Sequence, residues 1–238
     1  MQGLGRDNMR LTDRILGGFM SPQDAIIEGF FGVIMALDVS NFMRLALFGQ
    51  DEKAIIFALS VAIFGCNLAW GMADALVNSL SYYYDETRRY VFALKLRGAN
   101  CDEEAAKEAC KALEEAMTDV ESDILDAQGK EVMAREIARC ARAKEPRKPE
   151  MRRAILTISG VTIFMNVAAG LPIIGAYLLD SVIGINACTL LANIIGLVML
   201  FLIGYYQDRG IGRRHLWAGV SMALLGLVLL SIIIALGG

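Results

Sequence analysis

The sequence predicts an all-α membrane protein: five transmembrane helices with a helical cytosolic insertion between the second and the third. The chain of 238 residues is 55% hydrophobic and has a mean hydropathy of +0.47, which is high for a soluble domain. Five windows are long and apolar enough to cross a bilayer core, which takes about 20 residues. Most of the charge is confined to residues 85–153, between the second window and the third.

The five windows are Gly29–Phe48, Ala54–Ala73, Ala154–Leu179, Ala187–Tyr206 and Leu216–Leu236. The last four contain no charged residue, which is rare for a run of this length in the core of a soluble protein. We therefore divide the chain into three parts. Residues 1–84 hold an N-terminal segment and the first two helices, residues 85–153 form the cytosolic module, and residues 154–238 hold the last three helices.

Lysine and arginine predict the orientation in the membrane. Of the 23 basic residues, three lie in the N-terminal segment, 15 lie between Arg88 and Arg153, and three lie in the stretch RGIGRR before the fifth window. Because cytoplasmic loops carry an excess of these residues, we expect a cytoplasmic N-terminus and a C-terminus outside. The expected location is integral to a membrane, which is the cell membrane if the protein is prokaryotic.

The segment 85–153 is predicted to form a small helical module. Its apolar residues recur at spacings of three and four, which indicates an amphipathic helix over 101–128, ended by Gly129. A second helix is expected over 130–144, before Pro146. One face of the first helix carries acids that are candidate ligands for a divalent metal, although such a row is also typical of a solvated face. The row consists of Glu104, Glu108, Glu115 and Asp119.

Three acids lie on one side of the first window and its N-terminal approach. An α-helix advances about 100° per residue, so Glu28, Met35 and Asp38 all fall within roughly 40° of Asp24. Ionisable residues in a membrane helix are costly and usually face the bundle interior or a water-filled path. Carboxylate oxygens suit divalent cations, and a thioether adds a soft ligand for a transition metal. All four are therefore candidate metal ligands.

The second window carries a matching polar stripe, because Asn67, Asp74 and Asn78 lie within roughly 40° of one another on a helix. Asp74 is the fifth candidate ligand. We expect it to converge with Asp24 and Asp38 on one cavity between the first two helices. The residues expected to line the ion path are Asn41, Asn67 and Asn78.

Plainer interpretations of these residues stay open. Asp24 and Glu28 also suit the start of a helix at the cytoplasmic interface, where the helix dipole favours negative charge. Asn67 and Asn78 also suit hydrogen bonding between helices, which is a common use of asparagine in membranes. Asp38 is harder to explain in this way, because it lies in the middle of its window.

The layout of the chain resembles the vacuolar iron transporter family, from about residue 14 to the end. The family's first helix has Asp-Gly followed by apolar residues and Phe, where this sequence has Asp24, Ala25 and Phe30. Its second helix has a methionine and then an acid, matched loosely by AWGMAD with Trp70 and Asp74. The stretches GLPII in the third window and IIIALGG near the C-terminus are similar to further family features.

The resemblance implies a homodimeric carrier that exports Fe²⁺, or a similar divalent metal, from the cytosol in exchange for protons. It also implies that the cytosolic helices gather metal through glutamates, and that the only ligand is the transported ion rather than a fixed cofactor. Two departures bear on metal selectivity, because Ala25 replaces the family's glycine and Trp70 replaces its membrane methionine.

Other functional classes fit the sequence less well. A net charge of −3 without basic and aromatic interleaving gives no argument for nucleic acid. The expectation is also that the chain is not an enzyme, because the GxGD motif of intramembrane aspartyl proteases and the acidic signature of CDP-alcohol transferases are both missing. The alternative to transport is a membrane scaffold that moves no ion and whose cytosolic helices bind a partner.

Overall fold

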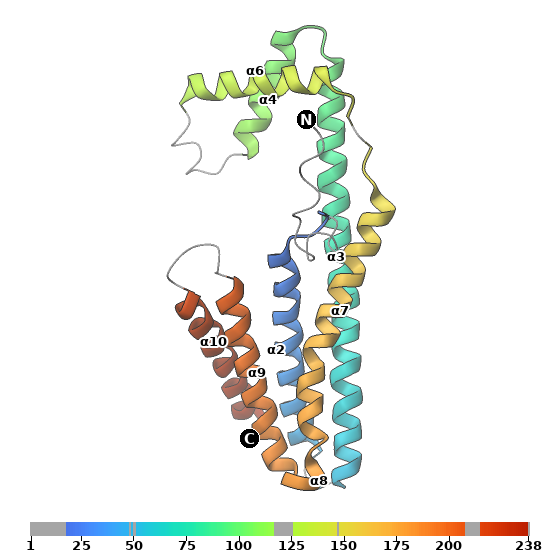
Figure 1. Cartoon of the computed structure of the whole chain (residues 1–238), viewed down its shortest axis with the longest axis vertical. Helices are drawn as coiled ribbons and strands as arrows, with labels where there is room; N and C mark the ends of the chain where they lie inside the picture. Colours follow the sequence, from blue (N-terminus) through green and yellow to red (C-terminus); the bar gives the residue numbers. More distant parts are fainter. Residues whose placement is uncertain are drawn as a thin grey trace, which may run out of the picture. The chain divides into compact units, whose positions relative to one another are not determined.

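A computed structural model describes residues 18–47, 49, 51–116, 126–146, 148–207 and 215–237. Every regular element in these residues is a helix, so the predicted all-α class is confirmed (Figure 1). The helices are, in chain order, α2 (Pro22–Ala46), α3 (Glu52–Gly98), α4 (Asp102–Ala116), α6 (Ala127–Ala143), α7 (Met151–Tyr177), α8 (Asp180–Ile183), α9 (Ile185–Gln207) and α10 (His215–Gly237).

Five helices are long and apolar enough to cross a membrane, namely α2, α3, α7, α9 and α10. Each coincides with one of the predicted windows, and their length and composition indicate an integral membrane protein. Helix α3 is longer than its window, with 47 residues. It continues because no proline interrupts the sequence before Gly98, although the apolar run ends much earlier.

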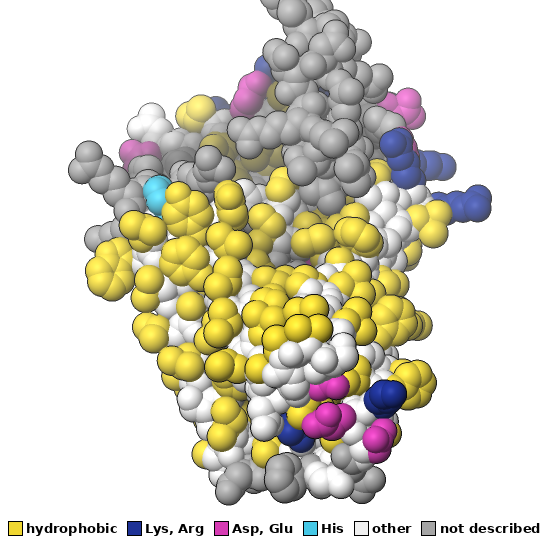
Figure 2. Space-filling model, turned by 60° about the horizontal axis from the view of Figure 1, so that its bottom comes forward, with side chains coloured by type: hydrophobic (Ala, Val, Ile, Leu, Met, Phe, Trp, Pro, Cys, Tyr) yellow, Lys and Arg dark blue, Asp and Glu magenta, His cyan; other side chains and the backbone are white. Residues whose placement is uncertain are grey.

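The chain forms two compact units, residues 1–79 with 152–238 and residues 80–151. The first unit has a buried apolar core that includes Leu37, Ile63 and Leu200 from three different helices. Its outer surface is apolar as well, as Figure 2 shows for one face. Side chains such as Phe57 and Trp217 are 72% and 74% exposed, which suits contact with lipid rather than with water.

In the second unit, small side chains bring α4 and α6 together. Ala105 and Ala109 of α4 and Ala134 and Ala138 of α6 are all buried, and alanine at a helix contact allows a short distance between axes. Leu96, near the end of α3, is buried in the same cluster. The sequence expectation that this unit is cytosolic stays a prediction.

Helix α6 begins earlier than predicted. The Asp126 side chain accepts a hydrogen bond from the backbone N–H of Gly129 at 2.7 Å, and this cap starts the helix at Ala127. The prediction that Gly129 ends the preceding helix is therefore wrong, because Gly129 lies in the first turn of α6. Helix α4 begins at Asp102, close to the predicted start, and residues 117–125 lie outside the described residues.

Candidate functional site

Asp24 has a local role at the start of α2. Ser21 is the N-cap, and its hydroxyl oxygen accepts a hydrogen bond from the backbone N–H of Asp24 at 3.1 Å. The Asp24 carboxylate accepts one in return from the backbone N–H of Ser21 at 3.3 Å. This reciprocal pair is a capping box, so the helix-start interpretation of Asp24 accounts for its position. Its side chain is exposed.

Glu28, one turn later, lies in a different environment. Its side chain is only 7% exposed and is held by amides from two other helices. Asn78 of α3 donates from Nδ2 to Glu28 Oε1 at 2.7 Å, and Asn166 of α7 donates from Nδ2 to Oε2 at 3.1 Å. A buried carboxylate bound from both sides is not an exposed interfacial acid. Glu28 therefore ties α2, α3 and α7 together at one point.

Thr162 completes this polar cluster from α7. Its hydroxyl lies 3.4 Å from Asn78 Nδ2, and its backbone carbonyl accepts from Asn166 Nδ2 at 3.2 Å. Thr162 and Asn166 are both fully buried. They are four residues apart, so they lie on one face of α7. From the sequence, Asn166 and its neighbour Met165 could be expected to line the same path, whereas Thr162 is a residue that the sequence analysis missed and that its spacing of four from Asn166 in an otherwise apolar window could have indicated.

Three oxygen atoms near this cluster are buried without a hydrogen-bond partner in the described part of the chain. They are Asn166 Oδ1, Asp74 Oδ2 and Asn67 Oδ1. The orientation of the Asn67 amide is fixed, because its Nδ2 donates to the carbonyl oxygens of Gly32 at 3.0 Å and Asn166 at 2.8 Å. Leaving a buried acceptor unpaired costs about 1–3 kcal/mol. A cation is the kind of ligand that oxygens of this sort attract.

Asp74 lies on the same helix as Asn78, whose amide donates to the Glu28 carboxylate. Asp74 and Asn78 are four positions apart, so Asp74 lies on the same face of α3 as the Asn78 amide that binds Glu28. Of the predicted site residues, the structure thus brings Glu28 and Asn78 into direct contact, with Asp74 one turn from Asn78 on α3, whereas Asp24 stays in its exposed helix cap.

Glycines allow the three helices to approach closely around Asn166. A Cβ added at Gly32 of α2 would lie 2.6 Å from the backbone oxygen of Asn166. A Cβ added at Gly71 of α3 would lie 3.1 Å from Asn166 Cβ and from Ile163 Cα. Since both contacts involve α7, the two glycines allow α7 to lie close to α2 and to α3 at Asn166. Small residues at such crossings are typical of membrane helices.

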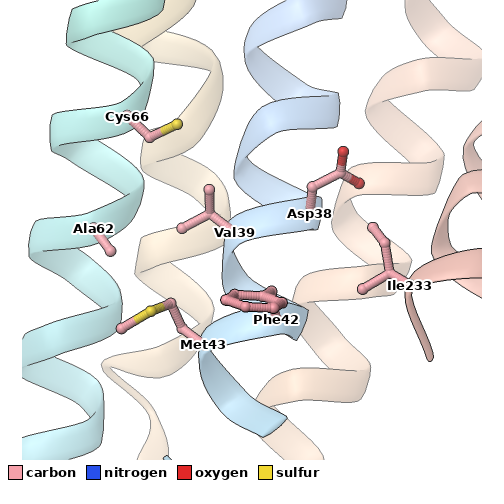
Figure 3. A pocket seen from close by; sticks show the side chains of 7 residues that line it. All are labelled: Asp38, Val39, Phe42, Met43, Ala62, Cys66 and Ile233. Carbon is pink, nitrogen blue, oxygen red and sulfur yellow. The ribbon is translucent and has the colours of Figure 1, made fainter. Parts of the chain in front are cut away.

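Asp38 lies apart from this cluster. It follows Glu28 by ten residues, which is about 15 Å along a helix axis. It lines a cavity of about 580 Å³ between α2, α3 and α10, together with Cys66 and apolar side chains such as Phe42 and Ile233 (Figure 3). The prediction that Asp38 converges with Asp24 and Asp74 on one cavity is therefore wrong. A role for Asp38 as a metal ligand stays a prediction.

Met35 is also displaced along α2. It follows Glu28 by seven residues, or about 10 Å along the axis, too far to share one ion with the Glu28 carboxylate. Another thioether lies closer, because a Cβ added at Gly29 would lie 3.4 Å from the terminal methyl of Met165. Met165 and Met199 line a mainly apolar cavity of about 360 Å³ beside α2.

Asn41 joins two helices. Its Nδ2 donates to Asn193 Oδ1 of α9 at 2.8 Å, and Asn193 Nδ2 donates to Asn41 Oδ1 at 3.2 Å. The Asn41 amide also donates to the carbonyl of Leu37 at 2.8 Å. These bonds occupy its amide, so the arrangement favours the helix-bonding interpretation over the lining of an ion path.

A double-mutant cycle on this pair should give a measurable coupling. Asn41→Ala, Asn193→Ala and the double variant are expected to show a coupling free energy of roughly 0.5–2 kcal/mol, because side-chain hydrogen bonds between membrane helices have values in this range. Reversible unfolding in mixed detergent micelles measures it. Additive effects of the two single variants would contradict the reciprocal bonds.

The predicted cytosolic acids do not form a single row of ligands. Glu104 accepts a hydrogen bond from the backbone N–H of Asn100 at 2.9 Å, whereas Glu108 and Glu115 line a groove with basic side chains. Asp119 lies outside the described residues. Within the described ranges, no group of three or more His, Cys, Asp or Glu side chains is placed to hold a metal ion. A metal site built from the described residues would therefore have to combine carboxylates with amide oxygens.

The chain matches no protein-family model, no curated protein and no solved structure.

Proposed function

We propose that the chain is a membrane transporter that exports a divalent metal cation, Fe²⁺ or a similar ion, from the cytosol in exchange for protons. One observation supports the proposal above the others: a buried carboxylate, Glu28, lies among three apolar helices beside buried oxygens that have no partner in the described residues. An ionisable group in such a place is expensive and usually serves an ion or proton path.

The proposed site uses the Glu28 and Asp74 carboxylates and the amide oxygen of Asn166. Three protein oxygens with water in the remaining positions suit a six-coordinate divalent cation. The amides of Asn78 and Asn166 hold the Glu28 carboxylate in place before the ion arrives. Such positioning lowers the cost of ordering the ligand when the ion binds.

Coupling to protons follows from the same carboxylates. A carboxylate binds metal only when it is ionised, so protonation releases the ion and metal binding releases protons. Glu28 and Asp74 together carry two negative charges when ionised. They therefore balance either one divalent cation or two protons, and the exchange of one for the other is electrically neutral at the site.

The donor atoms indicate a preference among metals. Carboxylate and amide oxygens favour Mn²⁺, Fe²⁺ and Mg²⁺ over softer ions such as Cu⁺. Trp70 stands where the vacuolar iron transporter resemblance places a methionine, so no thioether comes from that position of α3. We also propose, on the resemblance, that the transporter is a homodimer, and, on the distribution of lysine and arginine, that residues 85–153 face the cytosol.

Flux measurements test the transport proposal. The purified full chain in sealed liposomes should carry Fe²⁺ or Mn²⁺ down its gradient, with about two protons moving the opposite way per metal ion. A metal-sensing dye and a pH-sensing dye inside the liposomes would record both movements. If a folded protein moves none of Fe²⁺, Mn²⁺, Co²⁺ or Zn²⁺, the transport proposal is wrong and the scaffold alternative is favoured.

A further inference from the structure

A groove of about 530 Å³ lies within the second unit, between α3 and α4. Four basic side chains line it, from Arg88, Arg89, Lys95 and Lys111. Two acids, Glu108 and Glu115, lie on the same lining. The groove therefore has a formal charge of +2, although the chain as a whole has a net charge of −3.

Helical spacing explains why these side chains face one another. On α3, Arg88, Phe92 and Lys95 are separated by four and three residues, so they share one face. On α4, Lys111 shares a face with Glu108, three residues before it, and Glu115, four residues after it. The buried contact of Leu96 with Ala105 and Ala109 holds the two helices against each other beside the groove.

Most of the positive charge in the groove is not neutralised by ion pairs. Arg89 pairs with Glu86 at 3.1 Å on an exposed surface, where such a pair contributes little. Arg88, Lys95 and Lys111 form no ion pair within 4.0 Å among the described residues. Within the described part of the chain, their donors are thus not held by an acid and can contact an anion in the groove.

We propose that this groove binds a phosphate group, carried by a soluble phosphate compound or by a lipid headgroup. Guanidinium and ammonium groups on two sides match the several anionic oxygens of a phosphate. Phe92 adds an apolar wall for the uncharged part of the ligand. A net positive groove also opposes the binding of a divalent metal to Glu108 and Glu115. The proposal does not depend on the transport function.

Binding to the full chain in neutral detergent tests the proposal. Pyrophosphate, titrated by calorimetry, represents the soluble source. Phosphatidylglycerol, counted by native mass spectrometry against phosphatidylcholine, represents the lipid source. At least one of the two should bind, and the double variant Arg88→Gln with Lys111→Gln should weaken it by about tenfold or more, because two charge-assisted contacts are lost.

The matched control is Lys107→Gln with Arg135→Gln, which removes the same charges from α4 and α6 outside the groove. It should change binding by about twofold or less, because diffuse attraction between exposed charges is screened by salt. Equal weakening of binding by the two double variants would overturn the proposal. So would a chain that does not bind pyrophosphate and binds phosphatidylglycerol no better than phosphatidylcholine. Helix content by circular dichroism confirms that each variant is folded.

A third variant separates phosphate binding from metal binding. Glu108→Gln with Glu115→Gln raises the formal charge of the groove from +2 to +4. If the groove binds phosphate, pyrophosphate or phosphatidylglycerol should bind several-fold more tightly. If Glu108 and Glu115 instead hold a divalent metal, each chain should bind one Mn²⁺ fewer and phosphate binding should be unchanged, which would contradict the proposal.

Discussion

Replacing Glu28 by glutamine is expected to reduce metal transport at limiting metal concentration by at least about 100-fold. The variant keeps the size of the side chain but removes its negative charge. Changes to residues that only orient a metal ligand already cost about 10–100-fold in affinity, and Glu28 is proposed as the ligand itself. The glutamine would also present an N–H₂ group to Asn78 or Asn166, both of which donate to the carboxylate.

The pH dependence of transport should also change in the Glu28→Gln variant. In the unmodified protein, lowering the pH on the loading side should reduce metal uptake, because protons compete with the metal for the same carboxylates. Glu28→Gln should leave a residual flux that depends less on pH, since one competing group is gone. Flux into liposomes at two external pH values, with the internal pH held constant, measures both effects.

Asp24→Asn is the matched control, because it removes one acid from the same helix. Asp24 is exposed and its contacts are those of a helix cap, and asparagine still accepts a hydrogen bond there. Its transport should stay within a few-fold of the unmodified protein. If Glu28→Gln transports normally with unchanged pH dependence, the Glu28 carboxylate only joins helices and the proposed site is wrong.

The spanning helices could be predicted because length and hydropathy are local properties of the sequence. The cluster around Glu28 depends instead on contacts between distant residues. Asn166 binds the Glu28 carboxylate from 138 positions along the chain, and no pattern within α2 indicates that partner. Burial of Glu28 follows from the packing of α3 and α7 onto α2, which the sequence of one helix does not reveal.

The misplacement of Asp38 and Met35 has a simple geometric reason. A helical wheel compares directions around the axis and leaves out distance along it. Glu28 and Asp38 point within roughly 80° of each other but are separated by about 15 Å along α2. Asn78 was correctly placed near the acids because it lies only four residues from Asp74 on its own helix. Angular agreement predicts a shared site only for residues about one turn apart.

Replacing Gly32 by alanine is expected to destabilise the protein by about 1–3 kcal/mol, the usual cost of overpacking a filled contact. The added Cβ would lie 2.6 Å from the backbone oxygen of Asn166 and 2.9 Å from its Cα. Backbone atoms of a helix cannot move aside singly, so α2 and α7 would have to separate. Separation would also stretch the 3.0 Å hydrogen bond from Asn67 to the Gly32 carbonyl.

Gly160→Ala on α7 provides the control for this expectation. A Cβ at Gly160 would have no atom outside its own helix turn within 4 Å, so the alanine should be tolerated and should stabilise the helix by about 0.5–1 kcal/mol. Unfolding of both variants in mixed micelles measures the difference. Because Gly32 is one turn from Glu28, separation of α2 from α7 should also lengthen the Asn166 bond to Glu28 and lower transport. Equal stability of Gly32→Ala and the unmodified protein would mean that α2 and α7 do not meet at Asn166.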